Sequence, residues 1–537
     1  MISPPNPEHE QATKSPSKPL LAFAVLFGFA LLVRVAGLSW GLPNENRWYS
    51  YHPDESTRQM VGAVVSLLGG DFNPHFFNYP SLSIYATWLI YQFLAGFGLL
   101  TDAVSPQYPW PVVRDIILAG RIFSVICGAL TVPLVWAIAR LLGMRKAAVL
   151  AGILVALTPG HVQHSHFATV DVPATFFVVL CIYLTLRAQN RKQLLWAALV
   201  AGLAAGTKYN AGLVVLAPLL RAWSPSFAGA KNGIWPLMGA QIVLAALGFL
   251  ISTPYSLLAP REFWGNPAQQ MGFAYELLHH PREGSGEIFQ QTGNGWIYHF
   301  TFNLPFVLTW PLIIGALVGL VFAARKREWW PVLAFLGVFF LSLGFSQVRF
   351  MRYLLPLAPI LVLLAAYGAS RLPFARIWGG VLAAFALIGS SNVLWPFLQP
   401  DPRDFEAGLL RSSFSRGETI ATINNPWYFT PPFQPRGDNQ SVERVAVVGT
   451  DIEKLRTANA SFLVLSELEI REAIRLRPNG IEAQFLKKVT QNQREKRWIR
   501  KHQIPFALPG RAFVPHDYLY TNPETRVYSF PAPLAPQ

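Results

Sequence analysis

An adjacent pair of carboxylates, Asp54-Glu55, gives the clearest chemical signal in the sequence. The pair ends the segment Tyr51-His52-Pro53-Asp54-Glu55, which follows the first long apolar run. Acidic side chains close to a membrane surface are costly unless water solvates them or a reaction uses them. A carboxylate there can remove the proton of an attacking hydroxyl, so Asp54 is the candidate general base. Glu55 is then its neighbour in orientation or acceptor binding. A helix start capped by Asp54 explains the same residues structurally, and the two interpretations are compatible.

A second polar group surrounds Asp171, and it follows three histidines. His161, His164 and His166 lie a few residues before Asp171. Such a group can ligate zinc, or a divalent ion shared with Asp54. The spacing fits no compact metal motif, and histidines near a membrane surface more often form hydrogen bonds, so we assign no metal and no other cofactor. Asp171 is expected to hold the loop or the acceptor. The predicted secondary site contains Asp171, His52, His166 and Tyr209.

The composition is that of a protein with several membrane spans. Of 537 residues, 52% are hydrophobic and 14% are charged, and the mean hydropathy is +0.31. Soluble domains carry about 25% charged residues. The net charge of +15 arises from Lys and Arg in short loops between apolar runs, which indicates membrane orientation and not nucleic-acid binding. The two cysteines lie in apolar runs, so no disulfide framework is indicated.

The apolar runs predict about eleven transmembrane helices. Basic loops such as Arg325-Lys326-Arg327 face the cytoplasm if the tail at 1–19 does too. The predicted spans are Leu20–Leu38, one within Val112–Leu142, Ala147–Gly160, Val172–Leu186, Leu194–Gly206, Ala211–Leu220, Trp235–Thr253, Phe302–Ala324, Pro331–Phe345, Tyr353–Ser370 and Ile377–Trp395.

Two runs require a decision, because each changes the side on which later loops lie. Counting Ser81–Leu100 as a span would move every later basic loop outside, so we predict a helix in the membrane interface. The run Leu194–Leu220 is predicted to be two short helices, joined outside the cytoplasm at Gly206–Asn210.

The chain therefore divides into an all-α polytopic membrane domain at 20–398, with a large first extracytoplasmic loop at 39–111, and a polar C-terminal region at 399–537. The C-terminal region is predicted to be a small extracytoplasmic α/β domain. Its predicted strands are Thr419–Ile423, Val445–Val448 and Phe462–Leu465, with helices at Asp451–Ala458 and Glu467–Leu476.

Several short motifs occur in an order that resembles a known family over roughly the first 400 residues. They are His52–Glu55, Gly70–Pro74, Phe77–Leu82, Ala119–Thr131, Ala168–Pro173, Gly202–Lys208 and Arg352–Pro356. Together they resemble GT-C superfamily glycosyltransferases of the protein-mannosyltransferase-like branch. This branch includes glycosyltransferase family 39, the lipid A aminoarabinose transferase and the galacturonosyltransferases of the lipopolysaccharide core.

The resemblance implies a GT-C fold and transfer of a sugar from a polyprenyl-phosphate carrier with inversion at the anomeric carbon. Asp54 then deprotonates the acceptor, and cations stabilise the leaving phosphate. Lys208 and Arg352 are the expected phosphate ligands, with Arg349 and Arg58 as further candidates. Structural alternatives are a lysine that snorkels from a helix end, for Lys208, and interfacial anchors, for Arg349 and Arg352.

A transporter or flippase of a lipid-linked sugar is the main rival, since it too has many spans and intramembrane charges. Transporters often carry inverted repeats, and the sequence shows no second copy of the half that carries the acidic pair. The expected partners are a polyprenyl-phosphate-linked sugar, a lipid, glycan or protein acceptor, and the bilayer, with no nucleic acid. We expect a bacterial inner membrane with the active site facing the periplasm. The sequence leaves open which sugar and which acceptor are used.

Overall fold

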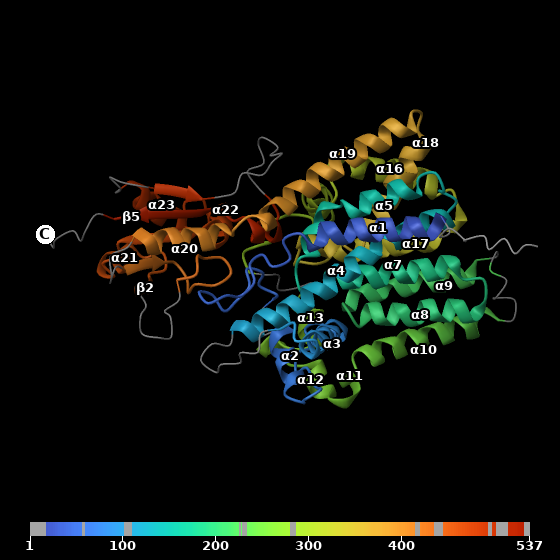
Figure 1. Cartoon of the computed structure of the whole chain (residues 1–537), viewed down its shortest axis with the longest axis horizontal. Coiled ribbons are helices and arrows are strands. Elements are labelled where there is room, and N and C mark those ends of the chain that lie inside the picture. Colours follow the sequence, from blue (N-terminus) through green and yellow to red (C-terminus); the bar gives the residue numbers. More distant parts are fainter. Residues whose placement is uncertain are drawn as a thin grey trace, which may run out of the picture.

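The computed structural model has a helical domain followed by a small α/β domain (Figure 1). It describes residues 18–55, 60–100, 110–224, 227, 233–279, 286–413, 419–433, 444–491, 497–500 and 514–530. The predicted tail at 1–19 therefore lies almost wholly outside the described residues. Most helices of the first domain run in one common direction, and the sheet lies at one end of them (Figure 1).

The helical domain contains the apolar runs found in the sequence, where η marks 3₁₀-helices and, for η5, a π-helical turn. Its elements are α1 (Lys18–Val35), α2 (Met60–Leu68), α3 (Leu82–Gly96), α4 (Trp110–Leu141), α5 (Ala148–Ala156), α6 (Pro159–His164), α7 (Asp171–Arg187), α8 (Arg191–Ala205), η1 (Tyr209–Val215), α9 (Leu216–Trp223), α10 (Ile234–Ser252), α11 (Tyr255–Leu258), α12 (Pro260–Trp264), η3 (Pro267–Gln269), α13 (Phe273–Leu278), α14 (Gly295–Tyr298), η5 (His299–Asn303), α15 (Leu304–Val307), α16 (Trp310–Ala323), η6 (Arg327–Trp329), α17 (Trp330–Gly344), η7 (Met351–Leu354), α18 (Ala358–Arg371), α19 (Ala375–Leu394) and η8 (Trp395–Leu398).

Three helical stretches in the described part of the chain are long and apolar enough to cross a membrane. They are Trp110–Leu141, Ile234–Ser252 and Ala375–Arg411, and a pair bent by 116°, Gly295–Val307 with Trp310–Ala323, makes four if it counts as one span. The expected number of about eleven is therefore not confirmed. Several predicted runs form shorter helices, such as α7 with 17 residues and α18 with 14, whereas a straight span needs about 20.

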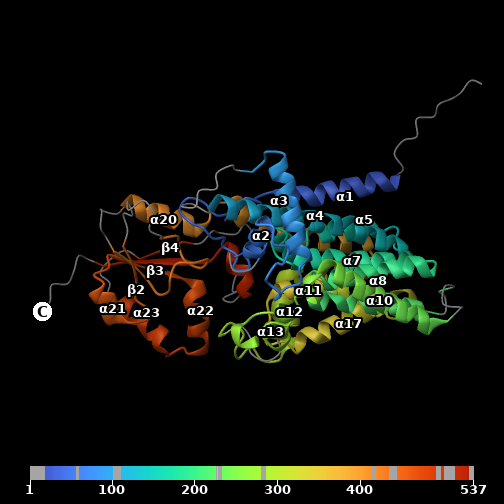
Figure 2. The ribbon, with the colours of Figure 1, turned by 90° about the horizontal axis from the view of Figure 1, so that it is seen from below.

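Both contested runs take the predicted secondary structure. The run Ser81–Leu100 forms α3, which lies across the direction shared by α7, α8 and α10 (Figure 2). Leu89 and Phe93 of α3 and Phe97, the residue that caps its C-terminus, are exposed by 58%, 62% and 67% and follow one another at helical spacing. An apolar stripe of this kind suits a helix lying in the membrane interface. The run Leu194–Leu220 breaks after α8 and resumes at η1, as predicted.

Close packing of α8 on α10 fixes the position of this break. A Cβ atom added to Gly202 would lie 2.0 Å from the Ala245 carbonyl oxygen, and one on Gly248 would lie 2.2 Å from that of Leu199. Small residues allow helix backbones to approach closely in membrane proteins. Lys208, which follows the break, is therefore held by a rigid helix pair.

The C-terminal domain is a five-stranded mixed sheet with the strand order β2-β1-β3-β5-β4. Strands β1, β2 and β3 are parallel, and β5 runs antiparallel to both β3 and β4. The three predicted strands and two predicted helices are confirmed, whereas β4, β5, α20 and α23 were not predicted. The elements are α20 (Pro402–Ser413), β1 (Thr419–Thr422), β2 (Arg444–Val447), α21 (Ile452–Thr457), β3 (Phe462–Ser466), α22 (Glu467–Leu476), α23 (Ile481–Gln491), β4 (Arg497–Arg500), η9 (His516–Thr521) and β5 (Thr525–Ser529).

Candidate active site

Asp54 lies in the connection between α1 and α2, and it is held from two sides. Its backbone N–H donates to His52 Nδ1 at 3.2 Å, and its Oδ2 lies 3.0 Å from Arg352 Nη2. The Asp54 side chain keeps 15% exposure. Burial raises the pKa of Asp54, and the charge of Arg352 opposes that rise without cancelling it. Asp54 is thus a constrained carboxylate that is a stronger base than an ordinary aspartate. Its side chain also remains partly exposed, so a substrate can contact it.

Glu55 has a different environment although it is the next residue. Its carboxylate pairs with Arg121 Nη2 at 2.7 Å, and both side chains are fully buried. It also accepts hydrogen bonds from the Ala168 N–H at 2.6 Å and from the Ser50 hydroxyl. Burial alone would raise the pKa of Glu55, but the charge and hydrogen bonds of Arg121 outweigh burial and lower it. Glu55 therefore ties the loop to α4 and positions Asp54.

Lys208 and Asp171 form the second half of the site. Lys208 Nζ lies 2.6 Å from Asp171 Oδ1 at the start of α7, and it also sits 4.0 Å from the centroid of the Tyr353 ring. Arg352 Nε lies 3.7 Å from the other oxygen of Asp171. The two expected phosphate ligands are thus brought together with Asp54, and both are paired with carboxylates.

A third carboxylate, Asp517, reaches this cluster from η9 in the C-terminal domain. It accepts hydrogen bonds from the N–H groups of Met351 at 3.2 Å and Arg352 at 3.0 Å. Its Oδ2 also lies 3.6 Å from Arg352 Nη1 and 3.8 Å from His164 Nε2. The sequence reasoning missed Asp517. An acid set among aromatic residues, as in Tyr518 and Tyr520, is the signal that could have marked this segment within a polar tail.

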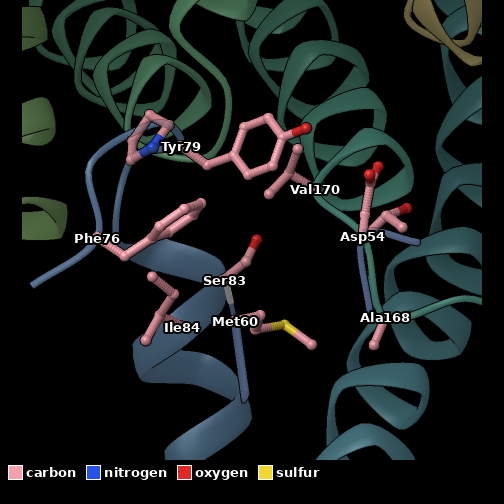
Figure 3. A pocket seen from close by; sticks show the side chains of 10 residues that line it. Asp54, Met60, Phe76, Tyr79, Ser83, Ile84, Ala168 and Val170 are labelled. Carbon is pink, nitrogen blue, oxygen red and sulfur yellow. The ribbon is translucent and has the colours of Figure 1, made fainter. Parts of the chain in front are cut away.

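A small pocket of about 20 Å³, enough for a water-sized group, opens beside Asp54 (Figure 3). Figure 3 shows Asp54 on one side of the pocket, with Tyr79 and Ser83 on the other. Its lining is otherwise mainly apolar and comes from α2, from the region around the start of α3, and from the segment before α7. The lining residues are Asp54, Met60, Phe76, Tyr79, Pro80, Ser83, Ile84, Ala168, Thr169 and Val170. The pocket can place a hydroxyl group against the candidate base.

Glu276 on α13 is a further acidic residue near the site that the sequence did not reveal. Burial raises its pKa to about 8, and the charges of Lys208 and Asp54 act on it in opposite directions. Glu276 is therefore mostly neutral near pH 7. A single carboxylate on a helix of only six residues gives no sequence signal that separates it from solvated acids.

The remaining predicted residues hold the surrounding chain. His52 packs on Phe167 at 4.4 Å between ring centroids. The two ring nitrogens of His166 lie 2.8 and 2.9 Å from the carbonyl oxygens of Val162 and Ala36, and the one that carries the proton donates a hydrogen bond. The Tyr209 hydroxyl donates to the Phe77 carbonyl at 2.8 Å. Of the expected secondary site, Asp171 and His52 directly contact the cluster of Asp54, Lys208 and Arg352, and His166 and Tyr209 do not.

Of the two further phosphate candidates, the structure describes Arg349, which does not join the cluster of Asp54, Lys208 and Arg352. Arg349 donates to the Thr292 hydroxyl at 2.7 Å and to the Gly293 carbonyl at 2.8 Å, which anchors that loop. Arg58 lies outside the described residues.

The three histidines before Asp171 diverge. His161 Nδ1 contacts Arg34 at 2.9 Å, His166 Nε2 lies against the Ala36 carbonyl just after α1, and His164 approaches Asp517. Among the described residues, no group of three or more His, Cys, Asp or Glu has the arrangement of a metal site. The considered zinc set of these histidines with Asp171 is therefore not assembled here.

A known protein family matches part of the chain. Residues 112–257 match the family described as dolichyl-phosphate-mannose-protein mannosyltransferase. This confirms, over that segment, the resemblance to the protein-mannosyltransferase-like branch. The segment contains Arg121, Asp171 and Lys208. An uncharacterized protein of Aquifex aeolicus (strain VF5) is 34% identical over 102 residues, which are 18% of this chain and 20% of that protein. The match thus spans a fifth of that relative.

Comparison with solved structures finds similar chains at low sequence identity and with TM-scores below 0.5. ArnT from Cupriavidus metallidurans in the apo state is 15% identical with a TM-score of 0.49, covering 85% of this chain and 95% of that one. The same protein bound to undecaprenyl phosphate is 14% identical with a TM-score of 0.49, covering 96% and 99%. The archaeal oligosaccharyltransferase AglB from Archaeoglobus fulgidus, in complex with an inhibitory peptide and a dolichol-phosphate, is 13% identical with a TM-score of 0.47, covering 85% and 71%.

Proposed function

We propose that this protein is an inverting membrane glycosyltransferase that moves a sugar from a polyprenyl-phosphate carrier to a hydroxyl group of an acceptor. The observation that supports it most is the position of Asp54. Its carboxylate lines the pocket and at the same time pairs with Arg352, next to Lys208. A base facing a pocket and cations beside it are the two parts that displacement of a lipid phosphate needs.

The reaction is a single displacement at the anomeric carbon. Asp54 takes the proton of the acceptor hydroxyl while the hydroxyl oxygen forms the new bond to that carbon. The bond from the carbon to the phosphate oxygen breaks, and its electron pair stays on the phosphate. Lys208 and Arg352 stabilise the charge that develops there. Attack on the side opposite the leaving group inverts the anomeric configuration.

Of the two adjacent acids, only Asp54 suits the role of base. Glu55 already accepts from Arg121, Ala168 and Ser50, and it is 1% exposed. A carboxylate with a saturated set of donors and a lowered pKa is a poor proton acceptor. Asp54 has a raised pKa and faces the pocket.

The setting follows from the same chemistry. The long apolar helices place the protein in a membrane, and the family match concerns a lipid-phosphate sugar donor. We place the site on the periplasmic side of a bacterial inner membrane, because basic loops mark the opposite side as cytoplasmic. The acceptor is a lipid, glycan or protein that presents a hydroxyl group there.

A donor panel tests this function. Purified protein is incubated with polyprenyl-phosphate-linked hexoses, pentoses and uronic acids together with a cell-envelope extract. We expect one donor to give a labelled acceptor and free polyprenyl phosphate in equal amounts. The flippase alternative predicts movement of the intact lipid-linked sugar across liposomes with no free polyprenyl phosphate, and that result would replace the enzyme assignment.

A further inference from the structure

Asp517 is surrounded by a set of donors that suits an oxyanion. Two backbone N–H groups, those of Met351 and Arg352, donate to its carboxylate, and the Arg352 guanidinium lies beside it. Consecutive amides together with an arginine are a common way to hold phosphate as well as carboxylate groups. The carboxylate comes from η9, more than 160 positions further along the chain.

Asp517 does not satisfy all the hydrogen-bond donors of the Arg352 guanidinium. Arg352 Nη1 has no hydrogen-bond partner in the described part of the chain, although Arg352 is only 3% exposed. Its distance of 3.6 Å to Asp517 Oδ2 exceeds that of a hydrogen bond. A buried arginine nitrogen therefore lies beside the oxyanion position, and the carboxylate that fills this position makes no hydrogen bond with it.

The same contact leaves other buried polar atoms without protein partners. Both ring nitrogens of His164 and of His516, and Nε2 of His52, make no hydrogen bond among the described residues. The three rings pack around Tyr520 or one another where η9 meets the helical domain. Unsatisfied buried groups cost free energy, so this closed arrangement of η9 is less stable than its burial alone suggests.

The charge balance of the cluster also favours release of Asp517 when an anion binds. Three carboxylates, Asp54, Asp171 and Asp517, face two cations, Lys208 and Arg352. A phosphate that entered this cluster would meet an excess of negative charge in a buried setting, where repulsion is poorly screened. Removal of one carboxylate restores the balance for the incoming anion, and Asp517 is the carboxylate that belongs to a separate domain.

We propose that the Asp517 carboxylate occupies an oxyanion site at Arg352 in the free protein, and that the phosphate of the lipid carrier displaces it and moves η9 away. The inference rests on the proposed function, because it assumes a lipid phosphate as ligand. It makes the C-terminal domain a gate that competes with the donor for one arginine.

Binding measurements on Asp517→Asn test the competition. The full-length protein in detergent is titrated with undecaprenyl phosphate, with undecaprenol and with inorganic phosphate. Because closure reduces the competent fraction, Asp517→Asn is expected to bind undecaprenyl phosphate about tenfold more tightly than wild type. Undecaprenol, which lacks the phosphate, should bind no more tightly. Asp451→Asn, which removes the same charge at the exposed start of α21, should bind like wild type.

Amide hydrogen exchange on the wild-type protein gives a readout that does not depend on any variant. Peptides covering 514–522 should exchange faster when undecaprenyl phosphate is added, and they should not respond to undecaprenol. Slower exchange, or none of this difference, would contradict displacement of η9.

The possible results separate the two proposals. If wild type binds undecaprenyl phosphate and Asp517→Asn binds it equally or less tightly, Asp517 does not compete with the phosphate for Arg352. Asp517 then only holds Arg352 in position, and the gate is rejected. A gain in affinity for inorganic phosphate alone would reject it as well. If wild type does not distinguish undecaprenyl phosphate from undecaprenol, the proposed function fails, and this inference fails with it.

Discussion

Arg352 Nη2 lies 3.0 Å from Asp54 Oδ2, which joins the loop after the first helix to the turn before α18. The positive charge of Arg352 holds the pKa of Asp54 below the value that burial alone would give it. The pair therefore sets both the orientation and the basicity of the proposed base.

The pH dependence of turnover should report this pair. Because Asp54 must be ionised to act as base, kcat should fall as the pH drops through its pKa, which lies above that of an ordinary aspartate. Arg352→Met removes the charge that lowers the pKa, so the acid limb should move to higher pH. Steady-state rates from pH 4 to 9 measure the shift. An acid limb at the same pH in both proteins would show that Arg352 does not influence the pKa of the titrating group.

The buried pair of Glu55 and Arg121 should matter mainly for stability. Arg121→Met leaves a fully buried carboxylate without its partner, which costs about 3–5 kcal/mol. Arg456→Met is the control, because it removes an exposed pair with Glu453 and should cost less than about 1 kcal/mol. Thermal unfolding in detergent compares them. Equal melting temperatures for the two variants would show that Glu55 is not held as described.

Lys208 and Asp171 should act as one unit. Their 2.6 Å contact is buried, so either Lys208→Met or Asp171→Asn removes most of what both contribute. The double variant should then lose less than the sum of the single losses, with a coupling of about 0.5–3 kcal/mol. A double-mutant cycle on kcat/KM measures this coupling. The control cycle combines Lys208→Met with Asp451→Asn, and there the two effects should add. Additivity in the first cycle would contradict the pairing.

Glu276 should destabilise the folded protein at alkaline pH. Its folded pKa of about 8 lies above the ordinary value of 4.5, so the folded state binds more protons between those two values. Its contribution to stability is complete below the unfolded pKa and is lost as the pH rises through the folded one. Glu276→Gln should therefore melt at a higher temperature than wild type at pH 9 and at nearly the same temperature at pH 4.5. A difference independent of pH would indicate a packing effect.

Part of the site could be predicted from the sequence, because its residues lie within short recognisable motifs. The motifs predict Asp54, Asp171, Lys208 and Arg352 as site residues, and the structure brings these four side chains together. The division of labour between Asp54 and Glu55 was not accessible. It depends on Arg121, which lies 66 positions away and fixes only one of the two acids.

The parts that escaped prediction depend on contacts between distant segments. Asp517 enters the site because a six-residue turn docks on the helical domain, and such a turn has no periodic pattern. Strand β4, with the sequence RWIR, is too short and charged to stand out, and among the described strands it pairs with β5 alone. The apolar runs predicted helices well, but the number of complete spans depends on helix lengths and bends that hydropathy does not encode.

The most direct test of the account compares turnover by Asp54→Asn and wild type with the polyprenyl-phosphate sugar that the donor panel identifies. Asparagine keeps the size of the side chain but cannot take the proton, so transfer should fall by about 10²–10⁴-fold. Binding of undecaprenyl phosphate should persist, and Asp451→Asn should turn over like wild type. Transfer by Asp54→Asn at the wild-type rate would contradict the central claim that Asp54 is the catalytic base.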